Sequence, residues 1–167
     1  MIVRGRVWKF GDNIDTDLLY PNVALKLPPQ EGARYVFHAN RPEWVDQVQP
    51  GDLVLGGRNF GCGSSRPVPR LFRVLGVKAV VAEEFASLFF RNSMNYAFPS
   101  LSCQGVLEAF EEGQTAEVDF SSGLVRNVDT GTQLQGDRLP ELLLNLLMTG
   151  GIMPMLRREG YFPQEAS

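Results

Sequence analysis

The residues best suited to chemistry lie in one glycine-rich segment, residues 57–67, which reads Gly-Arg-Asn-Phe-Gly-Cys-Gly-Ser-Ser-Arg-Pro. Glycines at 61 and 63 allow positive φ angles and a close approach of the backbone to a ligand. A predicted strand precedes the segment and a predicted helix follows it, so unpaired helical N–H groups would lie beside it. Such a turn favours binding of a carboxylate or phosphate. Arg66 adds a planar fork for a carboxylate, and Ser64 or Ser65 could cap the helix, with Pro67 in its first turn.

The same segment also fits an ordinary strand-to-helix turn with a capped helix, and spacing alone does not separate the two interpretations. It lacks the Gly-Lys-Ser/Thr ending of a phosphate-binding loop. The Gly-x-Ser-x-Gly order of a nucleophile elbow is absent too. A serine triad would need His38, the one histidine of the sequence, and nothing in the sequence brings it near Ser64.

A second polar segment, residues 11–21, carries three aspartates: Asp12, Asp15 and Asp17. The pattern is not that of an EF-hand loop, because the glycine at its sixth position and the glutamate at its twelfth are missing. An Asx-rich turn explains these residues as well as a ligand site does.

The composition excludes several classes of function. One histidine and two widely separated cysteines, Cys62 and Cys103, do not supply a zinc or iron–sulfur site, so any metal chemistry must come from a partner. The formal net charge of −3 makes nucleic acid an unsuitable partner. No apolar run is long enough for a membrane span or a secretory signal, and a cytoplasmic location is the expectation.

The elements that would position these segments alternate between strand and helix patterns, which predicts a mixed α/β fold over a single domain of residues 1–167. Breaks are expected at 11–13 and 28–32, with an ordered loop over 12–21. Strands are predicted at 2–10, 52–56, 78–82, 115–120 and 124–128, the last two forming a hairpin. Helices are predicted at 42–48, 71–75, 85–96 and 139–147, with another starting near Gly151.

Taken together, the two segments resemble a known family. Gly-Asp-Asn-Ile-Asp-Thr-Asp at 11–17 with Pro21, then Asn-Phe-Gly-Cys-Gly-Ser-Ser-Arg at 59–66, resemble the small subunit of isopropylmalate isomerase (3-isopropylmalate dehydratase). That subunit is the swivelling β/β/α domain of the aconitase superfamily. Residues 77–99, with Phe-Phe-Arg-Asn at 89–92, resemble the strand and helix that follow in the family. The resemblance is good over residues 2–105 and looser beyond.

The resemblance implies a hydro-lyase that acts on a hydroxy di- or tricarboxylate, most suitably isopropylmalate in leucine biosynthesis. A large subunit would supply a [4Fe–4S] cluster, and this chain would bind no cofactor itself. By motif match, Ser64 would remove the proton from carbon as an alkoxide, and Asp17 would support acid–base work. Ser65 and Arg66 would bind substrate carboxylate. Cys62 would be a packing residue of the tight loop.

The sequence also departs from the family. Ser-Ser-Arg is usually followed by Glu-His-Ala-Pro, whereas residues 67–70 here read Pro-Val-Pro-Arg, and Glu84 replaces a common serine. Residues 21–44, where the family reads the substrate's side group, show no familiar signature. The chain could instead belong to a homoaconitase or to a citraconate- or dimethylmalate-type hydratase, or, in another class, be a non-catalytic carboxylate-binding module. Self-association of the isolated chain is also possible.

Overall fold

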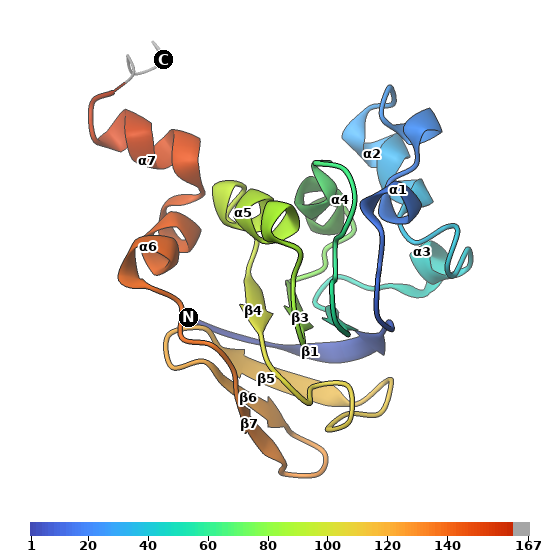
Figure 1. Cartoon of the computed structure of the whole chain (residues 1–167), viewed down its shortest axis with the longest axis vertical. Helices are drawn as coiled ribbons and strands as arrows, with labels where there is room; N and C mark the ends of the chain where they lie inside the picture. The colour runs from blue at the N-terminus through green and yellow to red at the C-terminus, as the bar shows by residue number, and fades with distance from the viewer. Residues whose placement is uncertain (162–167) are drawn as a thin grey trace.

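The structure, a computed structural model, describes residues 1–161 and is built around one seven-stranded sheet (Figure 1). The strand order is β4-β3-β2-β1-β5-β6-β7. Strands β1 to β4 run parallel to one another, while β5, β6 and β7 pair in antiparallel fashion. The bounds are β1 Ile2–Lys9, β2 Leu53–Gly56, β3 Ala79–Ala82, β4 Ser100–Ser102, β5 Thr115–Asp119, β6 Leu124–Asn127 and β7 Gln133–Gln135. The sheet is therefore mixed, and the carboxyl ends of its four parallel strands lie at the same edge.

The helices cover the parallel half of the sheet, with α4 and α5 over its strands and α1, α2 and α3 beyond the end of β1 (Figure 1). Helices α6 and α7 lie at the other end, beside α5. Two short 3-10 turns, η1 and η2, connect the early helices. The bounds are α1 Thr16–Leu19, η1 Asn22–Ala24, α2 Pro29–Gly32, η2 Ala33–Tyr35, α3 Trp44–Gln47, α4 Val68–Val74, α5 Ser87–Asn95, α6 Glu141–Thr149 and α7 Ile152–Arg158.

Alternation along the central strands divides the core into two clusters. Trp8 on β1 and Val54 on β2 point into one cluster, whereas their neighbours Val7 and Leu53 point into the other. This is the two-residue period of a strand buried on both faces. The first cluster, under α1 to α5, is rich in aromatic rings, with Phe10, Phe37, Trp44, Phe72, Phe89 and Phe98 among its members. The second lies between the sheet and α6 and α7.

The edges of the sheet meet after β7. The backbone N–H of Asp137 donates to the carbonyl of Ser102 at 2.8 Å, so the chain leaving β7 satisfies the edge of β4. Gly136 permits this approach, because a Cβ there would lie 2.6 Å from the same carbonyl oxygen. An edge strand is thereby covered, which removes a site of unwanted strand pairing.

Most predicted elements are confirmed with boundaries shifted by one to three residues, including the hairpin of β5 and β6. Two predictions are wrong. Residues 28–32 do not break the structure but form α2, because Pro28 and Pro29 stand at its start, where missing N–H groups cost nothing. The loop predicted over 12–21 contains α1, capped by the side chain of Asp15. Strands β4 and β7 lay outside the prediction because each has three residues and depends on its neighbours for pairing.

A buried carboxylate ties β1 to the start of β2. Asp52 is 5% exposed and accepts hydrogen bonds from Arg6 Nη2 at 2.6 Å, Trp8 Nε1 at 2.7 Å and the Gln49 amide at 2.9 Å. Burial alone would raise the pKa of Asp52, but the hydrogen bonds from Arg6, Gln49 and Trp8 outweigh it, so the pKa lies below its usual range. The charged form of Asp52 is therefore the one that stabilises this strand pair.

Asp52→Asn is expected to lower the free energy of unfolding by about 2 kcal/mol at pH 7, because charge-assisted hydrogen bonds are lost. Since the folded pKa is depressed, this stability is present above the unfolded pKa near 4 and is lost as pH falls through the folded value. The difference between wild type and variant should shrink below about pH 4. Urea unfolding between about pH 7 and pH 3 measures it, with the exposed Asp46→Asn as control. A gap that stays constant over this range would contradict the assignment.

Candidate active site

The two polar segments lie side by side at one edge of the sheet. Residues 11–17 follow β1 and residues 57–67 follow β2, which runs parallel to β1, so both emerge at the carboxyl ends of their strands. In open α/β sheets this edge is where ligands bind. The N–H of Thr16 donates to the carbonyl of Cys62 at 2.8 Å, and that of Gly61 donates to Ile14 at 2.8 Å. The residues singled out from sequence are thus brought together by main-chain hydrogen bonds.

Glycine is required twice in the second loop. Gly61 has φ 78°, and a Cβ there would lie 2.3 Å from Phe89 Cγ, a buried ring of α5. Gly63 has φ 89°, and a Cβ there would lie 2.7 Å from the Asp15 carboxylate. Any other residue at 61 or 63 would be strained in its backbone and would also collide. The loop can therefore press against both α5 and the first segment.

Ser64 and Ser65 are exposed on this braced loop. Buried Thr16 donates its hydroxyl to the carbonyl of Ser64 at 2.7 Å, and Asn92 of α5 donates its amide to Ser65 Oγ at 3.0 Å. The prediction that one of these serines caps the next helix is wrong. α4 begins at Val68 after Pro67, which stands at the cap position without a side-chain hydrogen bond. Both hydroxyls consequently lie ahead of the helix, on the loop itself.

Arg66 is buried, with 7% of its surface exposed, and braces the first segment. Its Nη2 lies 2.7 Å from Asp17 Oδ1 and 3.1 Å from Asn22 Oδ1, and its Nη1 donates to the carbonyl of Tyr20. Its Nε is buried without a hydrogen-bond partner among the described residues. The carboxylate that Arg66 meets in this structure is that of Asp17, while binding of a substrate carboxylate by Arg66 stays a prediction.

The cysteines have the character of packing residues. Cys62 is partly buried, and burial together with the nearby Asp15 carboxylate raises its pKa, which keeps the thiol protonated. Cys103 is 1% exposed, and burial raises its pKa to about 11, as suits a core residue. Within residues 1–161 no cluster of three or more histidine, cysteine, aspartate or glutamate side chains is arranged to hold a metal ion.

Two polar residues that hold the loop, Thr16 and Asn92, had no assigned role from sequence. Thr16 lies in the Asp-Thr-Asp sequence at 15–17, and Asn92 lies in the Phe-Phe-Arg-Asn sequence at 89–92. Both sequences belong to the segments that resemble the family. Their roles depend on contacts 48 and 27 residues away in the chain, with Ser64 and Ser65 respectively. Sequence spacing carries no signal for such distant pairs.

An exposed pair of serines, a buried arginine and an aspartate thus lie together at the carboxyl edge of a mixed sheet, and serine, arginine and main-chain N–H groups are the donors that carboxylates accept from. The family model described as the aconitase C-terminal domain matches residues 13–104, which includes the second loop and the first loop from Asn13 onward. The chain therefore belongs to the aconitase C-terminal domain family, in the group of small subunits named after 3-isopropylmalate dehydratase.

Relatives in this group match nearly the whole chain. The isopropylmalate/citramalate isomerase small subunit of Methanocaldococcus jannaschii is 41% identical over 160 residues, 95% of each chain. The 3-isopropylmalate dehydratase small subunit 1 of Methanopyrus kandleri is 42% identical over 161 residues, again 95% of each. The methanogen homoaconitase small subunit of Methanothermobacter thermautotrophicus is 39% identical over 154 residues, 91% of this chain and 89% of its own.

A solved structure confirms the fold. The crystal structure of 3-isopropylmalate dehydratase from M. jannaschii superimposes with a TM-score of 0.89 at 29% sequence identity, covering 96% of both chains. The predicted α/β fold of the aconitase C-terminal domain type is thus confirmed. No helix among residues 1–161 has the length and apolar character needed to cross a membrane.

Proposed function

We propose that this chain is the small subunit of a two-part hydro-lyase that isomerises 3-isopropylmalate and 2-isopropylmalate. The observation that carries the proposal is the exposed Ser64 hydroxyl on a loop held from both sides by Thr16 and Asn92. The names of the relatives, which cover the same length of chain, support the reaction class. A cluster-bearing large subunit is the proposed partner and a small hydroxy acid the proposed substrate, in the cytoplasm.

The proposed base is the Ser64 alkoxide, which takes the proton from the carbon next to the one that bears the hydroxyl. A serine hydroxyl is a poor base in water, and closure against a partner that excludes water favours the charged form only where donors face it. The proposed donors are main-chain N–H groups of the loop, whose tight turn depends on the positive φ angles of Gly61 and Gly63. The [4Fe–4S] cluster of the large subunit would act as the Lewis acid on the leaving hydroxyl.

Asp17 and Arg66 are proposed to work as a pair beside this base. Arg66 would bind a substrate carboxylate together with Ser65, and Asp17, with 53% of its side chain exposed, holds the guanidinium from the solvent side. Because Arg66 also bonds to Tyr20 and Asn22, its position is coupled to the segment that follows α1. Contact of a carboxylate with Arg66 would therefore affect the position of residues 21–44, the segment proposed to recognise the side group of the substrate.

That segment favours a substrate with an alkyl group. Val23 is 68% exposed and Leu25 is 43% exposed, while Ala24 between them is fully buried. Exposed apolar side chains next to the Arg66 contacts suit the isopropyl group of isopropylmalate. Lys26 and Arg34 are exposed in the same region and would suit an acid with a further carboxylate, such as homocitrate. Citraconate and dimethylmalate are smaller acids with apolar substituents, and the same apolar side chains would accommodate them.

A non-catalytic carboxylate-binding module is the competing proposal from another class, and the Pro-Val-Pro run at 67–69 is what supports it. In the structure these residues only begin α4: Pro67 stands at the cap position and Pro69 in the first turn. The departure therefore leaves the loop before it intact, with Ser64 and Ser65 exposed and Arg66 paired. This local geometry favours the catalytic proposal over a binding module.

Co-expression with a cluster-bearing large subunit from the same genome, followed by anaerobic assembly, tests the proposal. With 2-isopropylmalate as substrate, absorbance should rise as the unsaturated acid forms. Homocitrate and dimethylmalate are assayed separately in the same way, and citraconate, which is itself unsaturated, is assayed by loss of its absorbance. The chain alone should show no turnover. A stable complex with an intact cluster that converts none of the four acids would reject the hydro-lyase assignment, and preferred turnover of another acid would reject isopropylmalate.

A further inference from the structure

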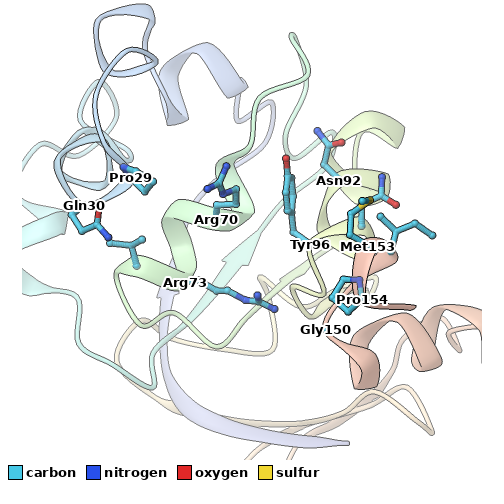
Figure 2. Close-up of a pocket in the computed structure, with 12 residues that line it drawn as sticks. Pro29, Gln30, Arg70, Arg73, Asn92, Tyr96, Gly150, Met153 and Pro154 are labelled. Carbon is cyan, nitrogen blue, oxygen red and sulfur yellow. The ribbon is translucent and has the colours of Figure 1, made fainter. Parts of the chain in front are cut away.

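A cleft of about 650 Å³ opens between α2, α4, α5 and the start of α7, next to the candidate active site (Figure 2). Its polar lining consists of Gln30, Arg70, Arg73, Asn92, Asn95 and Tyr96. No aspartate or glutamate is among the described residues that line it, so its two arginines are not neutralised from within. A cleft with this lining favours an anion with several oxygen acceptors, such as a carboxylate.

The cleft is continuous with the serine loop through one side chain. Asn92 lines the cleft and donates its amide to Ser65 Oγ at 3.0 Å. Figure 2 shows Asn92 of α5 and the hydroxyl of Tyr96, which directly follows α5, facing the same side of the cleft as the Arg70 guanidinium of α4. A small acid bound at Ser64 and Ser65 would therefore reach the mouth of the cleft across a single residue.

Arg70 is the arginine of the cleft whose side chain makes no hydrogen bond or ion pair with any described residue. Arg66 uses Nη1 and Nη2 for Asp17, Tyr20 and Asn22 and keeps its Nε buried, while Arg73 donates through Nη2 to the carbonyl of Ala97 at 2.6 Å. Arg70 is exposed, its Cζ lies 5.9 Å from the centroid of the Tyr96 ring, and its guanidinium N–H groups donate to no protein acceptor within the described residues. This cation–π contact holds the guanidinium near the ring and leaves its N–H groups available for a carboxylate.

We propose that this cleft binds a carboxylate of a small polycarboxylic acid through Arg70. We assign this carboxylate to the substrate of the proposed reaction, as the carboxylate that the serine loop does not bind. The assignment to substrate rests on the proposed function, whereas carboxylate binding by the cleft does not. Each candidate acid carries at least two carboxylates, and the contact proposed for Ser65 and Arg66 would account for one of them. Arg70 would then set the affinity for substrate without contacting the reacting carbon, which makes it a specificity-determining residue.

The binding half can be tested on the isolated chain, independently of turnover. Backbone amide NMR with citrate as the probe, at ionic strength matched with potassium chloride, should move the amides around Arg70, Asn92 and Tyr96. In Arg70→Gln the dissociation constant should rise about fivefold, as for an exposed ion pair. Arg91→Gln, which removes an exposed arginine of α5 that does not line the cleft, should match the wild type. Unmoved amides, or equal citrate binding by Arg70→Gln, would overturn the site.

The substrate half is tested on the assembled two-subunit enzyme. Arg70→Gln should raise KM about tenfold with little change in kcat, because the partner excludes water from the ion pair. Arg70→Lys should recover part of the loss, since it keeps the charge but not the fork. If citrate binding depends on Arg70 while KM is unchanged, the bound carboxylate is not that of the substrate and this half is wrong. Failure of the enzyme to turn over any acid would reject the proposed function and leave the citrate result to decide the cleft.

Discussion

Ser64→Ala is expected to lower kcat of the assembled enzyme by roughly 10²- to 10⁴-fold, the range for loss of a positioned base. KM should change little, because Ser65, Arg66 and Asp17 keep their contacts. The fold should also persist, since Ser64 is exposed and its one bond to Thr16 is made by its backbone carbonyl, which alanine retains. Loss of rate without loss of stability or assembly is therefore the expected result.

Steady-state kinetics on the complex, with gel filtration and thermal unfolding on the same samples, measures all three quantities. Ser87→Ala is the matched control, because Ser87 is also exposed but lies at the start of α5. Its kinetics should equal those of the wild type. If Ser64→Ala retains more than about a tenth of the wild-type kcat in an intact complex, Ser64 is not the base.

The elements that could be predicted from sequence are those whose signal is local. Strands β1, β2 and β3 are rich in β-branched or apolar residues, and α5 and α6 carry apolar residues at helical spacing. Strand β4 and helix α1 have three and four residues, so their own sequences barely favour one state. They form because β3 pairs with the first and because Asp15 caps the second.

The site shows the same division between local and distant causes. Glycines 61 and 63 and the exposed serines follow from the residue types of one loop, which is why sequence pointed to them. The pairing of Arg66 with Asp17 instead depends on how two segments 49 residues apart are registered by the bonds between residues 14–16 and 61–62. Spacing could suggest a carboxylate partner for Arg66, but only the structure shows that the chain supplies one itself.

The close contact of the glycine-rich loop with α5 predicts a large effect of substitution at Gly61 on stability. Gly61→Ala is expected to lower the free energy of unfolding by about 3 kcal/mol, combining about 1–2 kcal/mol for a non-glycine residue at positive φ with a similar cost of displacing Phe89. For a chain of this size the melting temperature should fall by roughly 6–12 °C. Because Phe89 stacks with Phe85 and packs against Phe60, the displacement would also spread to the two strand-end loops that carry them.

Gly105→Ala separates the two causes. Gly105 has φ 75°, close to the 78° of Gly61, but a Cβ at Gly105 would meet no atom within 4 Å. Its cost should therefore be the backbone part alone, about 1–2 kcal/mol, and the difference between the two variants measures the collision with Phe89. Urea unfolding of both, beside the wild type, gives this difference. Equal losses would mean that the loop can move off α5 at no cost, and then the rigid positioning argued for Ser64 would not hold.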